Sequence, residues 1–150
     1  MTRREMREHC FKMLFGAEFY SAEETAEQTE QYFDSPEEDD TTAEGDVEIV
    51  HQVGVKENDR TFLIDRVEGI IGKIPELDEK INSVAKGWKT NRMGKVELTI
   101  LRQAVYEILY DSEVPDKVAI NEAVDLAKKY GGKDAPAFIN GVLAKLVAAE

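Results

Sequence analysis

The chain of 150 residues contains one cysteine and two histidines, Cys10, His9 and His51. One cysteine excludes an intramolecular disulfide, and without Cys-x-x-Cys or His-Glu-x-x-His spacing we expect no metal site. No segment resembles a signal peptide or a membrane span, because Lys145 interrupts the apolar C-terminal stretch from 138 to 149. We therefore expect a soluble cytoplasmic protein without a membrane partner, in keeping with its single thiol.

Basic residues are missing between Met13 and Val55, whereas 13 Asp and Glu residues lie there. The remainder of the chain holds 19 basic and 18 acidic residues, so this one segment contributes −13 and the rest +1 to the net charge of −12. The first dozen residues contain four basic side chains and only two acidic ones. The overall acidity therefore does not exclude a partner such as a nucleic acid, whose phosphates reward local Lys and Arg.

Apolar residues recur at helical spacing along most of the chain, which predicts an all-α fold in a single domain. A capping box of Thr2 and Glu5 marks the start of the first helix. The periodic segments number about seven, at roughly 2–19, 21–35, 58–74, 77–88, 93–109, 118–130 and 134–146. The fifth segment is expected to form the longest and most apolar helix, at the centre of the core.

Caps and breakers predict where several helices begin and end. The third helix has Asn58 or Asp59 as its candidate N-cap and stops at Pro75. The sixth ends at Gly131 and Gly132, where a left-handed C-cap is expected.

The acidic segment at about 35–58 is interpreted as a loop insertion in this domain. Ser35–Asp46 combines charge, proline and glycine with no apolar residue larger than alanine, which favours a solvated loop. Val47–Val55 alternates like a strand but has no obvious partner, so strand, helix and irregular structure all stay open. Glu37–Asp40 lacks the alternating ligands and central glycine of a calcium loop, which favours plain solvated acidity.

Residue patterns that could support catalysis are better explained by packing. Cys10 adjoins His9, but neighbours on a helix point about 100° apart and Cys10 lies in the apolar row, which favours a core thiol. The glycines at 131 and 132 before Lys133 lack the phosphate-loop pattern. Close helix packing or capping explains them, and also Gly69 and Gly72, better. We therefore expect neither an enzyme nor a cofactor.

Arg3, Arg4 and Arg7 lie at the start of the first helix, where the helix dipole disfavours cations. Residues placed against local preference hint at another use, and arginine both pairs with phosphate and stacks on bases. The residues themselves leave two interpretations open, an anion or nucleic-acid site and an idle solvated turn.

Three long stretches, Arg3–Phe19, Trp88–Leu109 and Val114–Leu146, resemble the family of the bacterial transcription antitermination factor NusB. The last contains KVAINEAV, AKKYGG and FINGVL, a long and specific pattern. The resemblance implies two packed helical bundles that bind the single-stranded boxA RNA of nascent ribosomal RNA transcripts. It also implies two protein partners, the small-subunit ribosomal protein NusE and the antitermination complex of elongating RNA polymerase.

The resemblance also implies roles for single residues. By motif, RNA would contact Arg3, Arg4, Arg7, Asp134 and Phe138, and NusE would contact Phe15 and Glu97. Two departures weaken the transfer, because Glu5 replaces a third adjacent arginine and Phe15 lacks a tyrosine hydroxyl. Phe15 and Phe138 could instead be core residues, and Glu97 a solvated helix position.

Two other classes compete with this interpretation. The chain could be a protein scaffold or a homodimer module with little RNA binding of its own, as Glu5 and the acidic segment would suit. NusB-like domains also occur fused to RNA cytosine methyltransferases. A chain of 150 residues without a glycine-rich cofactor loop does not fit that enzyme.

Overall fold

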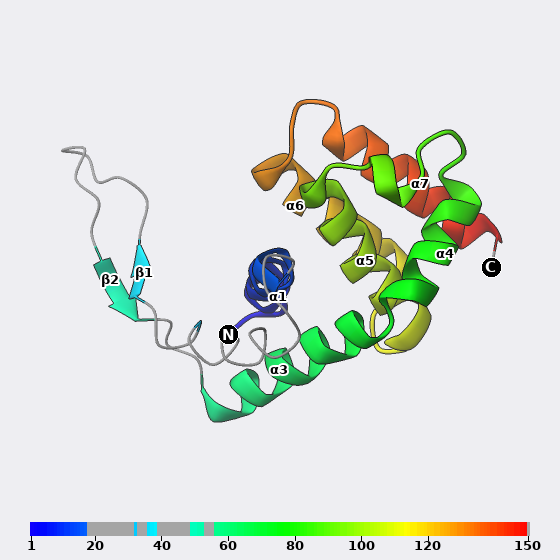
Figure 1. Cartoon of the computed structure of the whole chain (residues 1–150). Coiled ribbons are helices and arrows are strands. Elements are labelled where there is room, and N and C mark those ends of the chain that lie inside the picture. The colour runs from blue at the N-terminus through cyan, green and yellow to red at the C-terminus, as the bar shows by residue number, and fades with distance from the viewer. Residues whose placement is uncertain (18–31, 33–35, 39–48, 53–55, 150) are drawn as a thin grey trace. The chain divides into compact units, whose positions relative to one another are not determined.

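The computed structural model describes residues 1–17, 32, 36–38, 49–52 and 56–149 (Figure 1). Within this part the structure is helical apart from one short strand pair, which confirms the all-α fold class. The chain divides into two compact units, residues 1–67 and 68–150. The helix expected at 21–35 lies outside the described residues except for Tyr32, and the single-domain organisation stays a prediction.

Helix α1, Arg3–Ala17, begins in the first unit with the predicted capping box. The Thr2 hydroxyl accepts a hydrogen bond from the Glu5 backbone N–H at 3.1 Å, and the Glu5 carboxylate accepts from the Thr2 N–H at 3.4 Å. This reciprocal pair satisfies backbone groups that have no partner inside a helix. One face of α1 is buried and consists of His9, Cys10, Phe11, Met13 and Leu14.

Two short strands lie within the segment that the sequence predicts as an acidic insertion. β1, Pro36–Glu38, pairs antiparallel with β2, Ile49–Gln52, with an irregularity between Glu37 and Glu38. The alternation in Val47–Val55 thus corresponds in part to a strand, and its partner lies in the stretch predicted to be loop. The sequence offered no partner because Pro36–Glu38 has no strand-like pattern of its own.

Helix α3, Glu57–Gly72, runs from the first unit into the second. It begins before either predicted cap, because the Arg60 N–H already donates to the Lys56 carbonyl at 2.9 Å. Asn58 and Asp59 therefore occupy the first turn and do not cap the helix. Pro75 interrupts the helical run as predicted, since it lies at the start of the next helix, α4, Ile74–Val84.

The second unit is built around helix α5, Lys95–Tyr110. This helix contacts α4, α6 (Asp116–Tyr130) and α7 (Ala135–Ala149), and α6 and α7 also pack against each other (Figure 1). Half of the α5 side chains are buried. The predicted central position of this helix is therefore confirmed within the second unit, although α3 has the same length of 16 residues.

Two apolar residues do not lie where the helical pattern predicts. α4 ends at Val84, so Trp88 lies beyond the helix, and 58% of its surface is exposed. Val118 in the first turn of α6 is 40% exposed. Periodicity identifies apolar positions, but it does not distinguish a packed residue from one beyond the last helical turn.

The expectations about glycines are wrong at one position and confirmed at another. Gly131 has φ −92° and ψ 175°, so the expected left-handed cap is wrong. A side chain is excluded there because a Cβ would lie 2.6 Å from Ala135 Cβ and 2.8 Å from the Ala127 carbonyl oxygen. Gly69 is confirmed as a close-packing residue, since a Cβ would lie 2.7 Å from the Tyr106 hydroxyl. At Gly72, the last residue of α3, a Cβ would meet nothing within 4 Å, so close packing does not explain that glycine.

Among the helices that the structure describes, each is too short or too polar to cross a bilayer.

Candidate RNA and protein interface

The arginines of the N-terminal motif occupy the first two turns of α1. Arg3 and Arg4 are exposed and Arg7 is half-buried. Arg3 and Arg7 are four residues apart and share one helix face, whereas Arg4 projects about 100° away. On the next turn, the exposed Lys12 forms a 4.0 Å ion pair with Glu8. The structure thus holds the positive charges on a capped helix.

Glu5, which interrupts this basic cluster, has a local structural role. Its carboxylate accepts from the Thr2 hydroxyl at 3.0 Å as well as from the Thr2 N–H. A carboxylate at this position also interacts favourably with the positive end of the helix dipole. The departure from the family's basic pattern therefore stabilises the helix that carries the arginines.

Asp134 and Phe138 flank the start of α7. The Asp134 carbonyl accepts from the Phe138 N–H at 3.1 Å, which places the two residues one helical turn apart on the same face. Asp134 is exposed and Phe138 is half-buried, whereas Ala135 and Ile139 are buried. Phe138 therefore lies at the edge of the core, with part of its ring open to a ligand.

The two residues assigned to the protein partner are also partly accessible. The Phe15 ring is half-buried and stacks on Phe11, with centroids 6.0 Å apart and planes inclined by 25°. Glu97 is half-buried in the first turn of α5, where its carboxylate folds over Gly94. Since Gly94 has no Cβ, it leaves the space that this carboxylate occupies.

The predicted site residues are divided between the two units. The first unit holds Arg3, Arg4, Arg7 and Phe15 on α1, and the second holds Glu97, Asp134 and Phe138 on α5 and at the start of α7. The structure joins Asp134 with Phe138 on one face and lays the arginines along one helix. Each group is thus defined within its own unit.

A side-chain pair that sequence patterns did not indicate accounts for His9. This histidine is buried, and its Nδ1 shares a hydrogen bond with the Tyr32 hydroxyl, with the two rings edge to face at 5.7 Å. Cys10 is 2% exposed and is confirmed as a core thiol. Residues 23 positions apart carry no spacing signal, so only the fold could reveal this pair.

The described residues contain no group of three or more His, Cys, Asp or Glu side chains arranged to hold a metal ion. Two separate groups of candidate residues remain, the arginines on a capped helix of the first unit and a half-exposed phenylalanine beside a carboxylate in the second. Such side chains can bind phosphates, stack on bases or contact another protein.

Comparison with known proteins identifies the family of this chain. The NusB family model matches residues 4–148. The transcription antitermination protein NusB of Lachnoclostridium phytofermentans is 46% identical over 147 residues, which cover 98% of this chain and 99% of that protein. The chain belongs to the NusB family.

Two solved structures share the fold. The NusB structure of T. maritima matches with a TM-score of 0.76 and 26% identity, covering 99% of this chain and 92% of that one. A structure of the antitermination factors NusB and NusE in complex with dsRNA matches with a TM-score of 0.73 and 21% identity, covering 99% and 97%. At that lower identity the second match supports the fold alone.

Proposed function

We propose that this chain is a transcription antitermination factor that binds boxA-type single-stranded RNA of nascent ribosomal RNA transcripts together with NusE. In this role it acts on elongating RNA polymerase and catalyses no reaction. The observation that carries the proposal is the 46% identity to a NusB protein across nearly the whole of both chains. Because transcription takes place in the bacterial cytoplasm, the proposal also places the chain there.

The geometry of the two RNA-binding groups supports the nucleic-acid part. Arg3 and Arg4 are exposed at the end of a capped helix, where the guanidinium groups can reach phosphates. Phe138 keeps part of its ring accessible and can stack on an unpaired base, with Asp134 one turn away. These side chains match the needs of single-strand recognition, which combines local positive charge with stacking surfaces.

The proposed contact with NusE uses Phe15 and Glu97, both half-buried. A partly exposed aromatic ring and a carboxylate at the start of a helix are suited to a protein surface with an apolar pocket and a cation. NusE is chosen as the partner because the chain belongs to the NusB family, and a NusB protein has been solved together with NusE and dsRNA.

An anisotropy titration tests the proposal. Labelled boxA RNA and a scrambled RNA of equal composition are titrated with the full chain, with and without NusE. We expect tighter binding to boxA, and a further gain when NusE is present. Equal binding of the two RNAs under both conditions would refute the proposal.

The arginine cluster has a charge-matched control elsewhere in the chain. Replacing Arg3, Arg4 and Arg7 by Ala should weaken boxA binding and lower its salt dependence, by about 0.7 in the logarithmic slope for each phosphate that is no longer neutralised. The control variant carries Lys56→Ala, Lys117→Ala and Lys145→Ala, three exposed cations outside the proposed site. It should keep the preference for boxA.

The alternative class is a protein scaffold or homodimer module. If the triple arginine variant kept NusE binding and antitermination, and the wild-type chain bound boxA no better than scrambled RNA, that class would replace the proposal. Sedimentation of the free chain at rising concentration measures dimerisation directly, and its outcome is independent of the RNA titration.

A further inference from the structure

The loop between α4 and α5 presents an aromatic ring that the seven proposed site residues do not include. Trp88 is 58% exposed, more than any other exposed large apolar residue in the described part of the chain. Its backbone N–H donates to the Ala85 carbonyl at 3.0 Å, and its indole forms no hydrogen bond or ring contact with any described residue. An accessible indole face of this size is costly to leave in water and suits a flat ligand.

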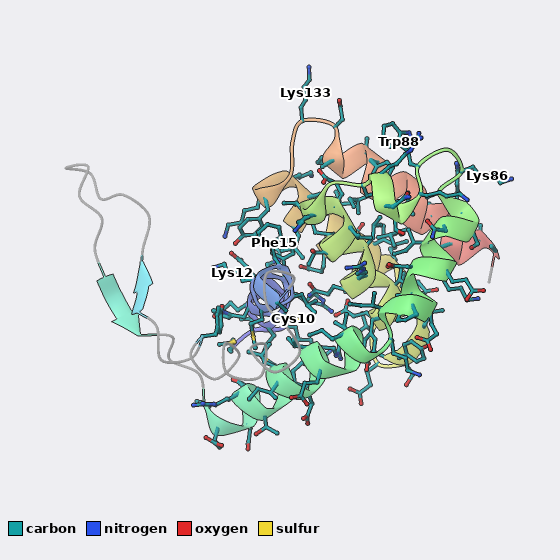
Figure 2. The ribbon with its side chains drawn as sticks, in the orientation of Figure 1. Cys10, Lys12, Phe15, Lys86, Trp88 and Lys133 are labelled. Atoms are coloured by element: carbon teal, nitrogen blue, oxygen red, sulfur yellow. The ribbon has the colours of Figure 1, made fainter. Side chains whose placement is uncertain are left out.

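Basic residues flank this ring along the chain. From Lys80 to Val96 the sequence has five basic residues and no Asp or Glu. Three of these cations, Lys86, Lys89 and Arg92, lie on the same loop as Trp88 and are exposed. No described residue forms a salt bridge with any of the three. Figure 2 shows Lys86 extending away from the helices of the second unit.

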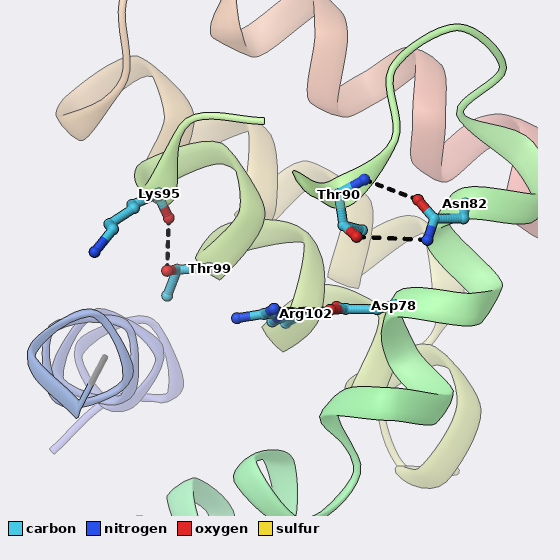
Figure 3. Close-up of polar contacts among 6 residues, drawn as sticks. All are labelled: Asp78, Asn82, Thr90, Lys95, Thr99 and Arg102. Carbon is cyan, nitrogen blue, oxygen red and sulfur yellow. Dashed lines mark hydrogen bonds and ion pairs between the residues drawn. The ribbon is translucent and has the colours of Figure 1, made fainter. Parts of the chain in front are cut away.

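The loop is held in one conformation by hydrogen bonds (Figure 3). The Asn82 side chain at the end of α4 accepts from the Thr90 N–H at 2.8 Å and donates to the Thr90 hydroxyl at 3.4 Å. Thr90–Arg92 forms the short helix η1, and Gly87 supplies the left-handed turn with φ +85°. Trp88 therefore stands on a rigid support between its anchors at Ala85 and Thr90.

We propose that the α4–α5 loop is an additional contact site for single-stranded RNA, in which Trp88 stacks on one base and Lys86, Lys89 and Arg92 bind the adjacent phosphates. Aromatic rings with interspersed cations are the usual means of binding single strands, because every base has a flat face and every nucleotide a negative charge. The inference rests on the proposed function. It adds to the RNA-binding surface a loop that contains none of the residues to which the family resemblance assigns a role.

Charge favours RNA over a protein as the occupant. A protein-binding surface centred on an aromatic residue has few charges at its centre, whereas here cations occupy positions 86, 89 and 92 around Trp88. Glu97, in the first turn of α5, is the first acidic residue after the loop, and its carboxylate folds back over Gly94. The loop from 85 to 93 thus offers a positive face with an indole ring.

The chain provides its own reporter, because Trp88 is the only tryptophan. Its emission is followed while the full chain is titrated with unlabelled boxA RNA, in parallel with anisotropy of the labelled RNA. We expect quenching of the emission with the same midpoint as the anisotropy change. RNA binding without any change in emission would overturn the inference and leave the proposed function intact.

Variants then measure the contribution of the ring. Trp88→Leu should weaken RNA binding roughly five- to hundredfold, the range expected for one stacked base, and Trp88→Phe should restore most of the affinity. Phe62→Leu removes an exposed ring of the first unit and is the control. Because Trp88 is exposed, the variants should melt at the wild-type temperature.

Three further outcomes are decisive. Equal RNA affinity of wild type, Trp88→Leu and Phe62→Leu overturns the inference alone. Loss of NusE binding in Trp88→Leu with unchanged RNA affinity also overturns it, and assigns the loop to a protein. If the wild-type chain fails to distinguish boxA from scrambled RNA with NusE present, the proposed function itself fails.

Discussion

Arg102 of α5 and Asp78 of α4 form a two-point ion pair, in which Nε and Nη2 of the arginine each donate to a separate carboxylate oxygen at 2.8 Å (Figure 3). Their side chains are only 15% and 21% exposed. The pair ties the two helices that enclose the Trp88 loop. A planar guanidinium is required for this geometry, because an ammonium group cannot donate along two parallel directions.

Substitution of this pair should lower the stability of the fold. Arg102→Ala leaves the Asp78 carboxylate partly buried without its partner, and we expect a loss of about 1–3 kcal/mol in the free energy of unfolding. Arg102→Lys keeps the charge and should lose less. Urea denaturation followed by circular dichroism measures both. A lysine variant as unstable as the alanine variant would show that charge contributes nothing at this site.

Gly69 and Gly141 should respond in opposite ways to alanine. At Gly69 a methyl group would meet the Tyr106 hydroxyl at 2.7 Å, and Tyr106 itself contacts Tyr110 at 5.1 Å between ring centroids. At Gly141, inside α7, nothing lies within 4 Å. We expect Gly141→Ala to gain about 0.5–1 kcal/mol from helix propensity, and Gly69→Ala to lose stability by overpacking.

A double variant separates the hydroxyl from other causes. Tyr106→Phe combined with Gly69→Ala removes the closest atom, so it should recover part of the loss. The measurement is a thermal melt of the single and double variants in the same buffer. If the loss in the double variant equalled the sum of the losses in the two single variants, the contact between residues 69 and 106 would not be the cause.

The capping box connects helix stability with RNA affinity. Thr2→Ala removes one side of the box and should cost about 1 kcal/mol locally, with Thr2→Ser as the control that keeps the hydroxyl. We expect faster amide hydrogen exchange in the first two turns of α1. Affinity for boxA should fall although no charge has changed, because the arginines lose their ordered support.

Removing the charge of Glu5 tests a different property of the same residue. Glu5→Gln keeps a side-chain acceptor for the Thr2 N–H and removes a negative charge next to Arg3 and Arg4. We expect higher affinity for RNA, most clearly at low salt. Unchanged affinity across the salt range would mean that this carboxylate does not face the RNA.

The acidic segment should weaken non-specific RNA binding through long-range repulsion. Deleting Ser35–Asp46 would remove β1 together with the charge, so we prefer replacing Glu37–Asp40 by the corresponding amides. Affinity for scrambled RNA should rise at low salt and return to the wild-type value near 1 M salt, where charges are screened within about 3 Å. An increase that persists at high salt would argue against electrostatics.

Sequence patterns predicted those features of the helices that depend on residues close together in the chain. The capping box of Thr2 and Glu5, the break at Pro75 and the apolar face of α5 each depend on neighbours within a few residues, and the structure confirms all three. The pairing of β1 with β2 depends on residues that adjoin only after folding. Gly131 differs from both cases, because the atoms that crowd it belong to Ala127 and Ala135, only four residues away, and its φ of −92° still contradicts the expected left-handed cap.

The residues of the candidate site also differ in how far the sequence could indicate them. Motif resemblance indicates Arg3 and Phe138, because their neighbours form long recognisable strings. Trp88 belongs to such a string too, but periodicity assigned it to a helix, and only its 58% exposure separates it from the core. A run of cations without acids around that tryptophan was the available signal, and the helical interpretation concealed it.

The hydrogen bonds between Asn82 and Thr90 have a kinetic consequence. Because they order the α4–α5 loop when the chain folds, an incoming RNA meets a surface that needs no rearrangement. The association rate should then fall as the ionic strength rises, because salt screens the attraction between the cations of the loop and the RNA phosphates. The lifetime of the complex should depend mainly on the Trp88 ring, and Asn82→Ala should slow association by making each encounter wait for the loop to order.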